Sequence, residues 1–294
     1  VGANSLDANT TASANTALGY ASLSANTSGS ENIAAGYATM QLNTTGGNNT
    51  AFGSLALQQN TTASNNTGIG NAALRYNTTG TKNTAVGSLT LDANTTSNDN
   101  TAVGYQALTS NTDGAGNTAL GRDALRDNTI ADNCTAVGLV SLQSNVTGTS
   151  NTAVGAGALQ DTTTGSQNTA LGKDSLRTNT TGQDNTAVGM DSMRLNTTGK
   201  QNVAIGQNSL EANTTANNNV AIGYESLKLN TTGANNTAVG TVALDANTTG
   251  TNNIAIGYNA LGLNTTAHNN TAVGQSSLGA NTTGSENTAV GANA

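Results

Sequence analysis

Apolar residues recur along this chain at fixed places in a 17-residue repeat, and polar residues fill the places between them. A glycine marks the repeat without insertion or deletion from Gly2 to Gly291, and we number each unit from this glycine as position 0. Position −1 is mostly Val, Ile or Leu, and position +4 is Leu except for Met40 and Met193. Repeats of fixed length bury surface against their neighbours, so this period predicts a solenoid rather than globular domains.

The polar and small positions are as regular as the apolar ones. Position −4 is Asn in every unit except that of Cys134, and position −2 is Ala except for Gly68. Position −3 is Thr or, in a few units, Val or Ile, and positions +7 to +10 mostly read N-T-T-G. Asparagine and glycine suit turns, and stacked Asn side chains can hydrogen-bond along an axis. We therefore expect turns at the glycine and at N-T-T-G, and Asn ladders at positions −4 and +7.

Two short extended segments fit each repeat better than a helix, because Asn, Gly and β-branched residues are weak helix formers. The first segment is −4 to −1. Since Thr at −3 exchanges with Val and Ile, we expect −3 and −1 to face inward and Ala −2 outward. The second is +2 to +6, with Leu +4 and the small or apolar +6 inward. The predicted fold class is all-β, a parallel β-solenoid of about 17 coils forming one continuous domain over residues 1–294.

The alanine column predicts an oligomer. An outward position usually tolerates Lys, Glu or Gln, whereas −2 admits only Ala or Gly. Close packing against another copy of the same chain explains this restriction, and it would also supplement the thin core of a single coil. The candidate subunit-interface residues are Ala85, Ala102, Ala119, Ala153, Ala204 and Ala221.

Tyrosine gathers at position +1, directly after the glycine turn. There the rings are expected to be half exposed, where they can stack on sugars, pack across subunits or simply cover a corner of the coil. The candidate surface-binding residues are Tyr20, Tyr37, Tyr105, Tyr224 and Tyr258.

Charge is sparse, at 9% of residues with a net charge of −7, and no basic run is present to follow phosphates. We expect no nucleic-acid partner. No apolar stretch approaches the ~20 residues that span a bilayer, so we expect no membrane insertion by this segment. Disorder is an alternative suggested by the low apolar content, but low charge and an unbroken register argue against it. The chain starts at Val1, inside a repeat, and we expect it to be a segment of a longer protein.

Catalytic chemistry is missing from the pattern. The single histidine, His268, has no partner in its column, and the single cysteine, Cys134, substitutes for an Asn. No carboxylate pair recurs, and hydrolase, metalloprotease and nucleotide-binding motifs are absent, so we expect no enzyme, no cofactor and no metal. The N-T-T tripeptides form glycosylation sequons, for example at Asn43, Asn77 and Asn281, although turn chemistry alone explains their recurrence.

Two of the units resemble a known family. Gln201-Asn202-Val203-Ala204-Ile205-Gly206 and Asn218-Asn219-Val220-Ala221-Ile222-Gly223 are similar to the N-S-V-A-I-G repeat of trimeric autotransporter adhesin heads of the YadA type. The N-T-A-V-G and A-L-x-x-N-T-T-G units also look like repeats of phage and bacterial tail-fibre-domain proteins. The resemblance covers the whole chain and implies a left-handed β-roll assembled as a homotrimer. The longer period and the Thr at −3 depart from the adhesin pattern.

Three functions remain open. The first is a non-enzymatic shaft or head segment of an extracellular adhesin or phage tail fibre, on a cell surface or virion tail, presenting attachment to a receptor or glycan. The second is a filament that self-assembles through uncapped coil ends. The third is ice or glycan binding by the Thr rows at +8 and +9 and by the tyrosines.

Overall fold

The computed structural model describes residues 2–294, and its regular structure consists of 17 three-residue β-strands, one before each repeat glycine from Gly19 to Gly291. Each strand occupies positions −3 to −1 of a repeat. The all-β, parallel β-solenoid predicted from the period is confirmed. The chain divides into two compact units, Val1–Thr147 and Gly148–Ala294, which are described separately below. We name each coil by the number of its glycine, so that coil 104 contains residues 100–116.

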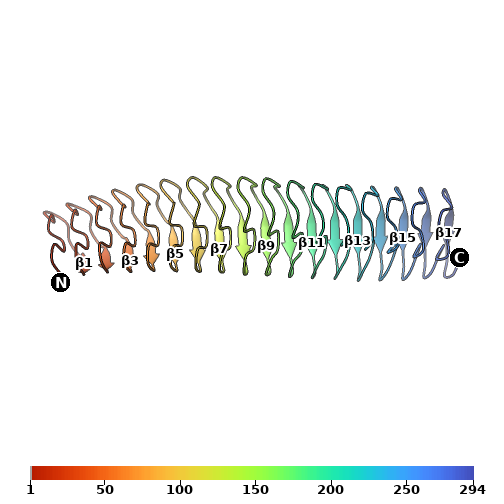
Figure 1. Cartoon of the computed structure of the whole chain (residues 1–294), viewed down its shortest axis with the longest axis horizontal. Helices are drawn as coiled ribbons and strands as arrows, with labels where there is room; N and C mark the ends of the chain where they lie inside the picture. The colour runs from red at the N-terminus through yellow and green to blue at the C-terminus, as the bar shows by residue number, and fades with distance from the viewer. Residues whose placement is uncertain (1) are drawn as a thin grey trace. The chain divides into compact units, whose positions relative to one another are not determined.

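In the first unit, neighbouring strands are parallel and pair residue for residue at an offset of one repeat, for example Ala17 with Ala34. Figure 1 shows the strand at the same place in each successive coil. The strands are β1 (Thr16–Leu18), β2 (Ile33–Ala35), β3 (Thr50–Phe52), β4 (Thr67–Ile69), β5 (Thr84–Val86), β6 (Thr101–Val103), β7 (Thr118–Leu120) and β8 (Thr135–Val137).

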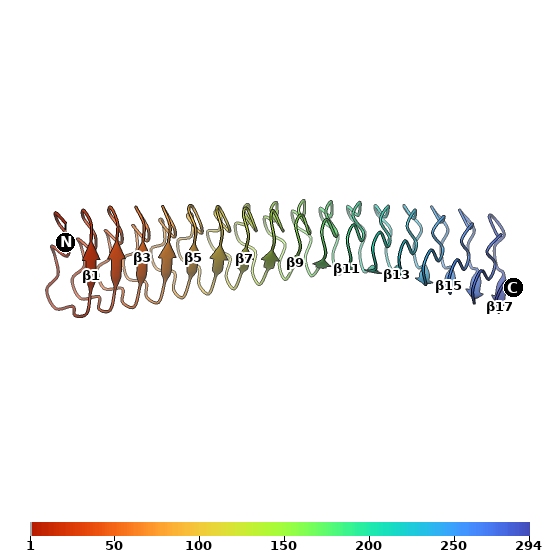
Figure 2. The same ribbon diagram turned by 90° about the horizontal axis from the view of Figure 1, so that it is seen from below.

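The second unit repeats this arrangement with the same register, for example Ala204 beside Ala221. Figure 2 shows the coils of the unit from below, again with one strand in each. The strands are β9 (Thr152–Val154), β10 (Thr169–Leu171), β11 (Thr186–Val188), β12 (Val203–Ile205), β13 (Val220–Ile222), β14 (Thr237–Val239), β15 (Ile254–Ile256), β16 (Thr271–Val273) and β17 (Thr288–Val290).

The second extended segment expected at +2 to +6 is wrong: this stretch is a turn in every described coil. Its backbone enters the left-handed region at +2 and +4, as at Gln106 (φ 55°) and Leu108 (φ 54°). A left-handed residue costs roughly 1–2 kcal/mol, whereas burying a leucine gains about 1.5–3 kcal/mol. Leu108 is completely buried, so its hydrophobic gain offsets the backbone strain at Leu108 itself. The leucine column therefore marks the core without marking a strand.

The repeat glycine is required by two constraints that act together. At Gly104 the backbone has φ 134°, a conformation that side-chain-bearing residues rarely adopt. A Cβ atom there would also lie 2.5 Å from the carbonyl oxygen of Gly121 in the next coil. The positive φ and the close approach of the next coil together explain why the glycine never varies.

The faces of the strand are the reverse of those expected. Ala −2 points into the coil, and Thr −3 and Val −1 point outward. The six candidate interface alanines are buried within their own chain, each no more than 1% exposed, so they are not available to another subunit: Ala85, Ala102, Ala119, Ala153, Ala204 and Ala221. The small side chain is required by the narrow interior of the coil itself, not by a neighbouring chain.

The buried asparagines explain this orientation. In coil 36, the side-chain amides of Asn32 and Asn43 both donate to the carbonyl oxygen of Gly46, each at 2.9 Å. Asn43 also donates to Oδ1 of Asn26 in the previous coil at 2.8 Å, and Oδ1 of Asn32 accepts the backbone N–H of Asn49 at 3.0 Å. Both predicted Asn ladders are thereby confirmed. Since −4 and −2 lie on the same side of a strand, an inward Asn brings Ala inward with it.

Candidate interaction surfaces

The outward strand face combines an apolar row at −1 with a row at −3 that is Thr in 13 of the 17 strands. None of the 17 strands carries a charged residue at −3 or −1. Position −1 holds large apolar side chains, and those most open to solvent are 37% to 72% exposed. The exposed large apolar residues of the face are Leu18, Ile33, Phe52, Ile69, Leu120, Leu171, Ile205, Ile222, Ile254, Ile256 and Val290. An apolar patch of more than a few hundred Å² on a protein surface usually marks an interaction site.

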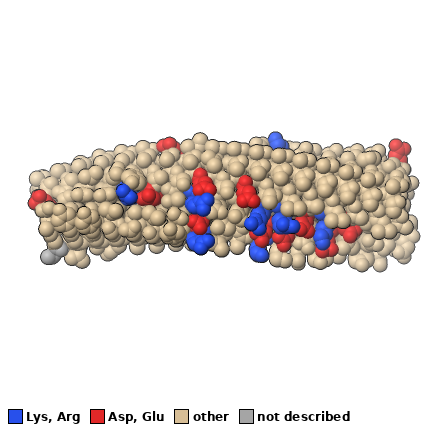
Figure 3. All heavy atoms as spheres, viewed as in Figure 1, with Lys and Arg blue, Asp and Glu red and all other residues tan. Residues whose placement is uncertain are grey.

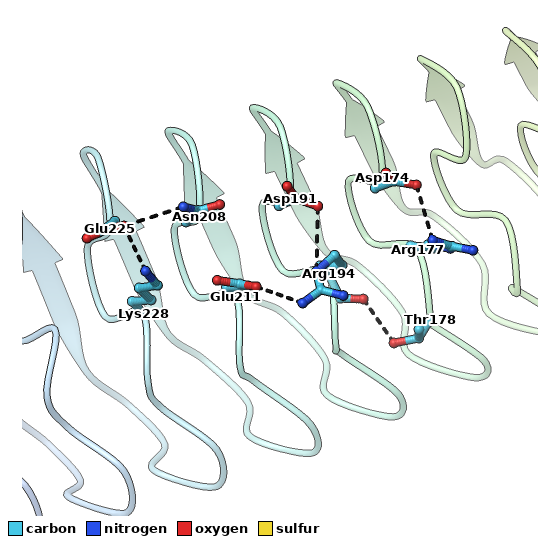
Figure 4. Close-up of polar contacts among 9 residues, drawn as sticks. All are labelled: Asp174, Arg177, Thr178, Asp191, Arg194, Asn208, Glu211, Glu225 and Lys228. Carbon is cyan, nitrogen blue, oxygen red and sulfur yellow. Dashed lines mark hydrogen bonds and ion pairs between the residues drawn. The ribbon is translucent and has the colours of Figure 1, made fainter.

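Charged residues lie mainly on the stretch from +1 to +6, on the other side of the glycine corner. On the face drawn in Figure 3, positive and negative side chains are intermingled. In the second unit, Arg194 pairs with Asp191 at 3.5 Å and with Glu211 of the next coil at 2.8 Å (Figure 4). Lys228 lies 2.7 Å from Glu225, and this hydrogen bond lowers the pKa of the Glu225 carboxyl.

Two aspartates at +5 have a different environment. Burial raises the pKa of Asp92, and the nearby Arg75 opposes the rise. Burial likewise raises the pKa of Asp245, with hydrogen bonds from backbone N–H groups opposing it. Within residues 2–294, neither carboxylate takes part in an ion pair within 4 Å. Position +5 is therefore half-buried rather than fully solvated.

The tyrosine column is exposed as expected, with each of the five rings between 47% and 57% accessible. Tyr20 and Tyr37 come from adjacent coils and stack on each other, with ring centroids 5.5 Å apart. Tyr105, Tyr224 and Tyr258 stand on coils that have no tyrosine in the neighbouring coil at +1. The column thus offers one aromatic pair and three separate rings. Their binding role stays a prediction.

The two threonine rows of the N-T-T-G turn differ. At +8 the hydroxyl donates to the backbone carbonyl of the next coil, as from Thr44 to Thr61 at 3.0 Å. At +9 the threonines are exposed, Thr45 among them. An ordered hydroxyl row for ice or glycan binding therefore remains a prediction for +9, because the +8 hydroxyls already donate within the protein.

The sequon asparagines at +7 belong to the core. Asn43 and Asn77 are completely buried, and both use the side-chain amide to donate to two carbonyl oxygens. A glycan on either nitrogen is incompatible with this fold, because it would replace these hydrogen bonds and occupy the interior. Asn281 lies in an exposed coil but makes the same two contacts.

The single histidine and the single cysteine both form hydrogen bonds with the preceding coil. His268 is exposed, and its Nδ1 accepts the backbone N–H of Thr251 at 3.0 Å. Cys134 is buried in the Asn column, where its own N–H donates to Oδ1 of Asn117 at 2.9 Å. Among residues 2–294 there is no pocket within either unit and no cluster of three potential metal ligands. The described residues also contain no helix of the length and apolarity that crossing a bilayer requires.

Comparison with known proteins gives no family. No protein-family model matches the chain, and no curated protein matches it significantly. Any proposal of function for this chain therefore rests on its repeat and on the surfaces of its coils.

The strand face is the surface that sequence reasoning missed. The exchange of Thr with Val and Ile at −3 predicts burial, but the face is solvent-accessible in the single chain. The signal that distinguishes the two faces is the Asn at −4, whose amide needs buried partners. Together with the alternation of side chains along a strand, it places −2 inside.

Proposed function

We propose that this chain is a non-enzymatic structural segment of an extracellular fibre, in which copies of the chain pack together through their outward strand faces. The observation that carries the proposal is the charge-free face formed in every strand by the residue at −3, mostly Thr, and the apolar residue at −1. Elsewhere on the coil surface, charges occur at +1, +2, +5, +6, +9, +11 and +12. Absence of charge from an exposed face is the pattern of a surface that becomes buried.

The area of the strand face can be compared with that of known interfaces. Nine strands at ~4.8 Å spacing and ~10 Å length give the second unit a face of about 430 Å². The eight strands of the first unit give a face of about 380 Å² by the same estimate. The face of each unit is thus about half of the ~800 Å² per partner that specific, stable interfaces bury.

The homotrimer, its left-handed coil and its place on a cell surface or virion tail follow from the resemblance to trimeric adhesin heads and tail-fibre repeats. In this arrangement three strand faces meet at a common axis, and the charged and tyrosine-bearing stretches face outward. The outward stretches are then free to meet a receptor or glycan. The segment itself contributes length, rigidity and presentation rather than chemistry.

The mass of the protein in solution tests the proposal. Sedimentation equilibrium of the wild type should give three times the chain mass of 29.0 kDa. Ile222→Glu on β13 puts a charge on the strand face and should shift the protein toward folded monomer. Thr232→Glu, an exposed position at +9, is the matched control and should leave the trimer intact. A wild type that sediments as a monomer at all accessible concentrations contradicts the proposal.

A further inference from the structure

Six consecutive coils of the second unit, coils 189 to 274, show a second period of two coils that is superimposed on the first. At +6 the residue alternates between large and small. The +6 residues are Leu195, Ala212, Leu229, Ala246, Leu263 and Ala280. The three leucines are 37%, 50% and 55% exposed. Each leucine therefore stands on the surface with an alanine one coil further along the chain, and leucines repeat every ~9.6 Å along the stack.

The same two-coil alternation occurs at +1, on the same stretch of the coil. The coils that carry a leucine at +6 carry Met190, Tyr224 and Tyr258 at +1. The coils that carry an alanine have Gln207, Thr241 and Gln275 instead. Exposed bulky side chains thus come in pairs on every second coil, separated by coils with smaller or polar ones.

Position +5 also varies regularly along these six coils, in the charge and in the size of its side chain. Its residues in order are Arg194, Glu211, Lys228, Asp245, Gly262 and Gly279. Stacking within the chain explains why signs alternate, since Arg194 and Glu211 form an ion pair. It does not explain the two glycines, because neither lies in the positive-φ region that favours glycine. It also does not explain the alternation of Leu and Ala at +6.

We propose that this surface, residues 189–280 at positions +1, +5 and +6, binds the same surface of a second copy of the chain in an antiparallel, two-fold arrangement. A two-fold axis between coils 223 and 240 brings each leucine opposite an alanine: Leu229 faces Ala246, Leu195 faces Ala280 and Leu263 faces Ala212. Such a contact is self-complementary, as an isologous interface must be.

The same two-fold axis also places complementary residues opposite each other at position +5. Lys228 of one copy faces Asp245 of the other, so the aspartate that lacks an ion pair within its own chain gains a cation. The long side chains of Arg194 and Glu211 face Gly279 and Gly262, which leave room for them. At +1, Tyr224 faces Thr241. Every large residue in the six coils meets a small or polar one.

The contact is weak by its size. Six coils at ~4.8 Å, with ~15 Å across the stretch, give about 900 Å² buried in total, below the range of standard stable interfaces. It is distinct from the strand face and goes beyond the proposed fibre role: it would join fibres side by side. Repetition of the contact along assembled chains would strengthen it by avidity.

A larger side chain in place of one of the facing alanines tests the proposed packing of Leu against Ala. Ala246→Leu adds apolar surface but blocks the space for Leu229 of the partner, so interlocking predicts at least tenfold weaker lateral association. Ala93→Leu, the same substitution at +6 of coil 87, is the control and should have no effect. Association would be measured by sedimentation velocity over a wide protein concentration range. Circular dichroism would verify that both variants fold.

Charge reversal at positions 228 and 245 provides a second test. Asp245→Lys should weaken lateral association, and the double variant Lys228→Asp with Asp245→Lys should restore it. The mass at low concentration reports the strand-face oligomer, so failure of the lateral contact and failure of the fibre proposal give different results. Absence of concentration-dependent association beyond that oligomer overturns the inference. Stronger association of Ala246→Leu than of wild type also overturns it, because that would indicate unspecific apolar contact.

Discussion

The side-chain amide of Asn60 donates to Oδ1 of Asn43 one coil away at 2.8 Å, and to the carbonyl of Ala63 in its own coil at 3.0 Å. Asn60→Asp keeps the shape but removes both N–H donors and buries a carboxylate beside two acceptors. We expect it to lower the free energy of unfolding by about 3–5 kcal/mol at neutral pH, the range found when a buried charge loses its partner. Guanidinium unfolding measures this loss.

The control for the ladder is Asn48→Asp, at the exposed +12 position of the neighbouring coil. It should change the free energy of unfolding by less than about 0.5 kcal/mol, as surface substitutions usually do. Equal effects of the two variants would contradict the assignment of the Asn60 ladder to the core.

Left-handed backbone at +2 predicts a stabilising substitution. Val242 has φ 48°, a conformation that is unfavourable for a β-branched residue. Val242→Asn should stabilise the protein by about 1 kcal/mol, because Asn tolerates this region. The reverse change, Asn259→Val at the same position of coil 257, should destabilise it by a similar amount. Thermal unfolding of both variants measures the pair, and shifts in the same direction would refute the strain argument.

Adjacent residues of β6 predict opposite phenotypes. Ala102→Glu places a charge in the interior of the coil, so we expect it to unfold the surrounding coils and raise hydrogen exchange there. Val103→Glu places the charge on the outward face, so we expect a folded chain that no longer associates. Hydrogen-exchange mass spectrometry together with sedimentation distinguishes the two. Loss of association with a preserved fold in Ala102→Glu would restore the original assignment of the faces.

The half-buried carboxyl of Asp92 predicts a pH dependence. Burial raises its pKa in the folded state above the unfolded value, so its contribution to stability is fully present below the unfolded pKa and is lost as pH rises through the folded pKa. Asp92→Asn should therefore be more stable than wild type at neutral pH, and the difference should vanish in acid. Unfolding curves collected from pH 3 to pH 7 test the trend. A constant difference across this range would contradict the burial effect.

The sequence predicted the period, the solenoid and both Asn ladders, because each depends on identical residues stacking on one another. It did not predict the conformation of +2 to +6. Leu108 is part of an apolar column whether it lies in a strand or in a left-handed turn, so periodicity alone cannot distinguish these two. The sign of φ at +4 depends on how the 17-residue coil closes, which is a property of the whole coil.

The candidate interface was placed on the wrong face for a different reason. Ala102 is small because the interior is narrow, and a small residue also fits a close contact between chains; composition does not separate these causes. The buried amide of Asn100 does separate them. Its Nδ2 donates to the carbonyl of Gly114 at 2.9 Å inside the coil, and Ala102 lies two residues further along the same strand.

The Asn ladders also give the stack of coils in each unit a direction. In both columns, a group of the later coil donates to Oδ1 of the earlier one, as from Asn77 to Asn60 and from the N–H of Asn83 to Asn66. The strand hydrogen bonds alternate in direction: Thr101 donates to the following coil and Gly104 to the preceding one. The Thr hydroxyls at +8 donate in the opposite sense to the Asn amides, to the following coil, as from Thr44 to Thr61. Each coil therefore offers different groups to its two neighbours, with Asn Oδ1 acceptors toward the following coil and Asn N–H donors toward the preceding one, so a coil can continue the Asn ladders in one orientation only.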